Sequence, residues 1–87
     1  MEMIGSVVEE QGVTFAIVLV KRWAEQTDSE AGKTRQVFQA YFPGLPLILA
    51  SQAADGTFEY QGRPDIVRFL AATDLSRIPW KKYRTNG

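Results

Sequence analysis

The sequence predicts a small α/β domain, equally describable as α+β, with the element order β-β-α-β-β-α. Two apolar runs, residues 15–20 and residues 46–51, are typical of strands that are buried on both faces of a sheet. A helical pattern separates the two runs, and a crossover of this kind joins parallel strands. We therefore expect a mixed sheet of three or four strands, in which these two are parallel with antiparallel neighbours outside them, covered by two helices.

A β-hairpin is expected at the start of the chain. Residues 3–9 and 13–21 are rich in strand-forming side chains, and the short connection between them contains Gly12. The second run is apolar on both faces, which is typical of a central strand. The first run is weaker, so we expect it to be an edge strand or an ordered arm.

The crossover is expected to be a helix that begins near Thr27. Thr27 and Glu30 have the spacing of a capping box, in which the two side chains bind free amides of the first turn. Pro43 then ends the helix. One side of the helix is apolar at helical spacing and comprises Ala31, Thr34, Val37, Phe38, Tyr41 and Phe42.

The same segment also ends like a phosphate-binding loop. Residues 27–34, TDSEAGKT, finish in Gly-Lys-Thr, but Thr27 stands where such a loop has its first glycine. The chain is also short for the sheet that nucleotide enzymes of this kind use. We therefore favour a capped helix with an exposed Lys33.

A second hairpin and a second helix follow the second buried strand. The turn chemistry of residues 52–56 leads into an alternating strand that places Phe58 and Tyr60 on one face. Pro64 suits the first turn of a helix, and Asp65 places a negative charge where the helix dipole favours it. The apolar face of this helix comprises Ile66, Val67, Phe69 and Leu70.

We divide the chain into one domain, residues 1–76, and a basic and aromatic tail, residues 77–87. The tail has no sustained periodicity, so its final residues are expected to be loose. It interleaves cations with aromatic side chains, which is the combination that binds single-stranded nucleic acid. The alternative is that Trp80 caps the core while the neighbouring lysines stay in solvent.

The absence of cysteine and histidine narrows the function. Without them the chain has no disulfide, no thiolate nucleophile, no imidazole base and no zinc or copper site of the usual kind. We therefore expect no cofactor and a protein that is not an enzyme, although carboxylate, lysine, tyrosine or serine chemistry stays open.

No apolar run is long enough to span a membrane, and the N-terminal residues are acidic where a secretory signal is basic. A cytoplasmic protein without membrane contact is expected.

The formal charge is zero overall, but it is unevenly placed. Residues 1–60 carry net −4 and residues 61–87 carry net +4. A chain polarised in this way attracts an acidic partner or another copy of itself. We expect a small interaction module for an unidentified protein partner, with a homodimer as one form that open sheet edges allow. The candidate partner-binding residues are Tyr60, Arg63, Asp65, Arg77, Trp80, Lys81, Lys82, Tyr83 and Arg84.

Two other functions stay open. Single-stranded nucleic acid would bind the tail, an alternative that is less favoured because the chain has no net positive charge. A small-molecule site or an enzyme would use Tyr60, Arg63 and carboxylates, and it needs a deep pocket. The simpler alternative, which we favour, is local capping in which Asp65 or another acid pairs with Arg63 at the surface.

Two resemblances extend these predictions. The strand-start proline, hairpin and terminal helix within residues 43–73 resemble the C-terminal part of thioredoxin- and glutaredoxin-like domains. In that family the proline is cis and faces a Cys-x-x-Cys pair, so the resemblance implies a cis Pro46 on a scaffold without redox activity. An ordinary hairpin and helix would have a trans proline instead. The segments EQGVTFAIVLVK, FPGLPLIL, GRPDIVRFL and RIPWKKY are similar to segments of short uncharacterised bacterial proteins, which implies kinship and no activity.

Overall fold

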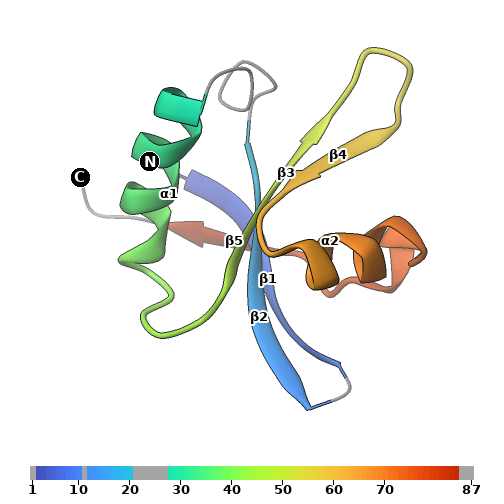
Figure 1. Cartoon of the computed structure of the whole chain (residues 1–87), viewed down its shortest axis with the longest axis horizontal. Helices are drawn as coiled ribbons and strands as arrows, with labels where there is room; N and C mark the ends of the chain where they lie inside the picture. The colour runs from blue at the N-terminus through green and yellow to red at the C-terminus, as the bar shows by residue number, and fades with distance from the viewer. Residues whose placement is uncertain (1, 11, 21–27, 85–87) are drawn as a thin grey trace.

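The structure, a computed structural model, describes residues 2–10, 12–20 and 28–84 (Figure 1). Within these ranges, strands and helices alternate in the predicted order, and a 3-10 helix and a further strand follow. The elements are β1 (Glu2–Glu10), β2 (Val13–Leu19), α1 (Asp28–Gln39), β3 (Leu47–Gln52), β4 (Phe58–Gln61), α2 (Pro64–Ala71), the 3-10 helix η2 (Leu75–Arg77) and β5 (Lys81–Arg84).

The strands form one mixed sheet in the order β4-β3-β2-β1-β5. β2 and β3 are parallel, and α1 lies between them in the chain as the crossover. β1 is antiparallel to β2, and β4 is antiparallel to β3. The predicted α/β class is confirmed, together with its parallel central pair and the antiparallel neighbours outside that pair.

The two helices lie on opposite sides of the sheet (Figure 1). Each one covers a separate hydrophobic cluster, because successive residues of a strand point to opposite faces. The buried residues on the α1 face are Met3, Ala16, Val18, Phe42, Leu47 and Leu49. Those on the α2 face are Phe15, Ile17, Ile48, Ala50, Ile66, Leu70 and Ile78. Both apolar runs are thus buried on their two faces.

The two ends of the chain differ from the sequence prediction. β1 lies between β2 and β5, so it is neither an edge strand nor an arm. Part of the expected tail forms β5, which pairs antiparallel with the first half of β1 and brings the described sheet to five strands. The sequence does not predict this strand because neither proline nor lysine, the residue types of Pro79 and its neighbours, favours the strand conformation. β5 forms nonetheless, because β1 supplies a backbone partner and the α1 face packs Tyr83.

The predicted apolar side of α1 is wrong in part. Val37 is 53% exposed and Tyr41 is 43% exposed, whereas Phe42 is buried. The helix ends at Gln39, so helical spacing no longer applies to Tyr41 and Phe42. Thr27 of the expected capping box lies outside the described residues.

Arg35 fastens α1 to the sheet. Its guanidinium donates hydrogen bonds to the Leu47 carbonyl and to both the carbonyl (3.0 Å) and the side-chain oxygen (3.1 Å) of Gln61. Leu47 begins β3 and Gln61 ends β4, so one side chain links the helix to both strands of the hairpin. Partial burial lowers the pKa of Arg35 from its ordinary value, but the arginine remains charged at neutral pH.

Pro46 precedes β3 with a trans peptide bond, since the described residues contain no cis peptide bond. The cis geometry that the thioredoxin-like resemblance implies is therefore not present. The Pro46 carbonyl instead accepts a hydrogen bond from the Ala16 amide at 2.9 Å, which joins the entry to β3 with β2.

Gly62 makes the turn from β4 into α2. Its φ angle is +156°, and a Cβ atom at this position would collide with the side chain of Ile48. Only glycine fits this close approach, and it lets α2 fold directly back onto the sheet.

Candidate interaction surface

β5 is an edge strand that carries most of the cations predicted for the tail. Lys81, Lys82 and Arg84 are exposed, and Tyr83 is half-buried. Among the described strands β5 has a neighbour, β1, on one side only. We call residues Lys81–Arg84 and their outward backbone the β5 edge.

The aromatic residues beside these cations face opposite sides of the sheet. Tyr83 pairs with Met3 across the strands and packs on the α1 face, where its ring meets Phe42 edge-on at a centroid distance of 5.6 Å. Trp80 packs against the cluster on the α2 face. The structure therefore does not bring Trp80 and Tyr83 together as a stacking surface, and the core-cap alternative for Trp80 is favoured.

The cations of the β5 edge also divide between the two faces. Lys82 pairs with Ile4 and therefore lies on the α2 face together with Arg84, whereas Lys81 shares the α1 face with Tyr83. Lys82 and Arg84 each make an interaction within the protein. The edge nevertheless carries three positive charges and no negative one, so it is cationic on both faces.

Ser6 holds the chain where it enters β5. This serine is buried in β1, and its hydroxyl donates a hydrogen bond to the Pro79 carbonyl at 3.1 Å. Ile78 is buried beside it on the α2 face, and the Trp80 amide donates to the Ile78 carbonyl at 2.8 Å. Ser6 could not be predicted as a positioning residue, because a single serine in a strand gives no signal until its partner is known.

Arg63 and Asp65 form a two-pronged ion pair at the start of α2. The Arg63 Nε–Asp65 Oδ1 distance is 2.8 Å, and the Nη2–Oδ2 distance is 2.7 Å. Hydrogen bonding to this guanidinium lowers the pKa of the Asp65 carboxyl to about 2. This is the simpler arrangement expected for Arg63, and it uses the Nε and Nη2 side of the guanidinium, one of the sides that could bind a carboxylate or phosphate in a two-pronged way.

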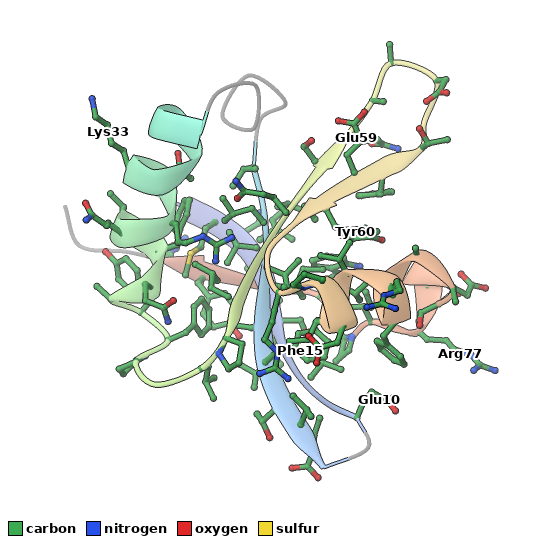
Figure 2. All side chains as sticks on the ribbon, viewed as in Figure 1. Glu10, Phe15, Lys33, Glu59, Tyr60 and Arg77 are labelled. Atoms are coloured by element: carbon green, nitrogen blue, oxygen red, sulfur yellow. The ribbon has the colours of Figure 1, made fainter. Side chains whose placement is uncertain are left out.

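Tyr60 is far from the β5 edge. It lies on β4, and Figure 2 shows it beside α2. Partial burial raises the pKa of its phenol. Neighbouring strands are about 4.8 Å apart, so the four steps from β4 to β5 separate them by about 19 Å. Tyr60 and the cations of β5 thus lie at opposite edges of the sheet.

A small pocket lies between the end of β1 and the end of α2. It has a volume of about 240 Å³, with Val8, Phe69, Leu70 and Ile78 among its apolar lining residues and Glu10 and Arg77 among its polar ones. Figure 2 shows Glu10 and Arg77 near this end of the molecule. The volume is below the roughly 300–1,000 Å³ of typical ligand sites. Tyr60 and Arg63 do not line it, so their expected small-molecule site is not formed here.

Asp74, which also lines this pocket, has a local structural role. Its side chain accepts a hydrogen bond from the Ser76 amide at 3.0 Å and caps the first turn of η2. Hydrogen bonding from Ser76 is the main reason that the pKa of Asp74 is lowered, and the nearby Arg77 contributes further. The described residues contain no group of three or more acidic side chains placed to hold a metal ion.

The chain matches no protein-family model, no curated protein and no solved structure. In the part of the chain that the structure describes, every helix is too short or too polar to cross a membrane.

Proposed function

We propose that this protein is a small non-catalytic module that binds a partner through the β5 edge. The observation that carries this proposal is an edge strand with three exposed, positively charged side chains on an anchored backbone. These side chains are Lys81, Lys82 and Arg84. Ser6 and Tyr83 anchor that backbone from the two faces of the sheet. The lack of histidine and cysteine in the sequence also favours function by contact.

The rest of the candidate set supports this choice of surface. Arg63 is paired with Asp65, and Trp80 is partly buried in the core. Both residues therefore contribute to the stability of the fold in their observed positions. The cations of β5 lie at an open strand edge, where a partner has access to side chains and backbone together, although Lys82 and Arg84 also make interactions within the protein.

Selection from a random peptide library tests the proposal. The double variant Lys81→Glu/Lys82→Glu changes the edge, and Lys33→Glu/Arg68→Glu is a matched control with the same change in net charge on the two helices. We expect peptides that bind the native protein and the control but not the edge variant. Peptides that bind all three proteins equally would contradict the proposal, as would the recovery of none.

Single-stranded nucleic acid is the second candidate partner. Three cations along one edge favour it, because a row of positive charges follows a phosphate backbone. The placement of Trp80 and Tyr83 on opposite faces argues against it, since bases stack on aromatic rings that share a surface. We therefore prefer a protein partner, and oligonucleotide binding serves as the competing outcome below.

A further inference from the structure

We propose that the β5 edge accepts an acidic, extended segment of a partner protein as an additional strand of the sheet. This inference rests on the proposed binding function and specifies the chemistry of the partner. Its three supports are the position of β5, the charge of its side chains and their distribution between the two faces.

The position of β5 provides the backbone part of the site. β5 is the last strand of the described sheet, and its four residues pair with Glu2–Gly5 of β1 on the inner side. An edge strand can pair through its outward N–H and C=O groups with an extended peptide. Ser6 and the buried Ile78 hold the chain just before β5, so this edge is formed before a partner arrives.

The charge of β5 selects the partner. None of its residues is acidic, and the stretch of β1 that pairs with it contributes one acid, Glu2, opposite Arg84. Three cations against one acid leave this edge with a net positive charge, and Glu9 and Glu10 lie at the opposite end of β1, which β5 does not cover. Two copies paired through β5 would bring cations of one copy against cations of the other, and like charges on facing positions are destabilising. An acidic strand would instead bring opposite charges to the facing positions, which is stabilising. The selection depends on the net charge of the edge, because Lys82 and Arg84 also make interactions within the protein.

The distribution of side chains predicts a pattern in the partner. Lys82 and Arg84 lie on the α2 face, and Tyr83 lies between them on the α1 face. Side chains on facing strands contact when they share a face. A partner strand therefore fits best when acidic residues alternate with apolar, β-branched ones, so that the acids lie beside Lys82 and Arg84 and an apolar residue lies beside Tyr83.

Fluorescence anisotropy with the full chain tests this inference. The probes are a short labelled peptide that alternates glutamate and valine, a lysine–valine counterpart, the glutamate–valine peptide with N-methylated backbone amides, and a single-stranded oligothymidylate. We expect only the first peptide to bind well. Its affinity should fall about tenfold or more in Lys81→Glu/Lys82→Glu. It should stay within about twofold in the control Lys33→Glu/Arg68→Glu.

Each alternative outcome overturns the inference in a recognisable way. Equal binding of the N-methylated peptide would mean attraction by charge without strand pairing. Tighter binding of oligothymidylate than of the acidic peptide would assign the edge to nucleic acid. If library peptides depend on β5 but lack acidic residues, the binding module stands and the acidic-strand inference fails.

Discussion

Ser6 shows how one buried polar side chain positions the candidate surface. The sequence places it between strand-forming residues, and the structure pairs its hydroxyl with the carbonyl of Pro79, 73 positions later in the chain. Removing the hydroxyl costs this partly buried hydrogen bond and leaves the Pro79 carbonyl without its donor within the protein. Ser6 therefore connects the stability of β1 with the position of β5.

We expect Ser6→Ala to lower the free energy of unfolding by about 1 kcal/mol. The same substitution should speed hydrogen exchange at the amides of β5 more than at those of β3, since only β5 depends on the Pro79 contact. Urea denaturation and exchange measured by NMR would check both effects. Gln36→Ala, at an exposed position of α1, is the control. Uniform acceleration of exchange in all strands would contradict the positioning role.

The ion pair between Arg63 and Asp65 has a pH dependence that can be measured. Because Arg63 lowers the pKa of Asp65 from 3.8 to about 2, the contribution of the pair to stability is fully present above pH 3.8. It is lost as the pH falls through about 2. NMR titration of the Asp65 carboxyl should show this low midpoint. Arg63→Gln should raise the midpoint toward 3.8, and an unchanged midpoint would show that the backbone sets the pKa instead.

At the scale of single residues, the sequence predicts which chemical groups are present better than it predicts which residues contact one another. The acidic start of α2 was predicted together with its simplest arginine partner. Arg35 was not identified, because an arginine in an amphipathic helix appears exposed until the facing carbonyls are known. Val37 is exposed although the sequence places it on the apolar side, because helical spacing does not fix the rotation of the helix on the sheet. Tyr41 is exposed for a different reason, since the helix ends at Gln39 before reaching it.

At the scale of elements, α1 depends on a polar contact as well as an apolar one. Phe38 packs against the α1-face cluster, and Arg35 spans the entry to β3 and the exit from β4. Val37 of the same helix is exposed. The contacts of Arg35 therefore determine how α1 is seated on the sheet.

Replacing Arg35 tests that seating. We expect Arg35→Ala to reduce the free energy of unfolding by about 2 kcal/mol, because two backbone carbonyls lose a charged donor. Arg35→Lys should recover only part of this loss, since a lysine ammonium cannot reproduce the planar fork that reaches both strands. Chemical denaturation would measure the effect, with Lys33→Ala as the exposed control. Full rescue by lysine would contradict a role for the fork geometry.

Predictability differs between elements for physical reasons. β2 and β3 could be predicted because strands buried on both faces leave continuous apolar runs, and their helical connection implies a parallel pair. β5 could not, because an edge strand with charged side chains has little intrinsic preference for the strand conformation. The sequence singles out its cations and aromatic residues as candidates, but their division between the two faces follows from pairing with β1, which the sequence does not encode locally.

At the scale of the whole molecule, the sheet has two unlike edges. β4 forms one edge and carries Glu59, whereas β5 forms the other and carries three cations. This arrangement places three of the six basic residues of the segment 61–87 along one edge of the sheet. A homodimer stays a proposal, and β4 is the edge at which it would avoid facing cations.

Charge reversal tests whether cations prevent β5 edges from pairing with each other. We expect a mixture of the native protein with Lys81→Glu/Lys82→Glu to associate more strongly than either protein alone, because the two edges become complementary. Sedimentation velocity would compare the three samples at equal total concentration. Raising the salt from about 50 mM to about 200 mM should weaken the mixed association. A mixture that sediments as the average of its components would contradict this expectation.

The central claim is that this protein works by contact at the β5 edge, and NMR mapping with a library-selected peptide tests it most directly. Titration of the isotope-labelled chain should shift the amides of Lys81–Arg84 first and most, with smaller changes in the paired half of β1. Shifts centred instead on the pocket near Glu10 and Arg77, or on Val37 and Tyr41 of the α1 side, would contradict the claim.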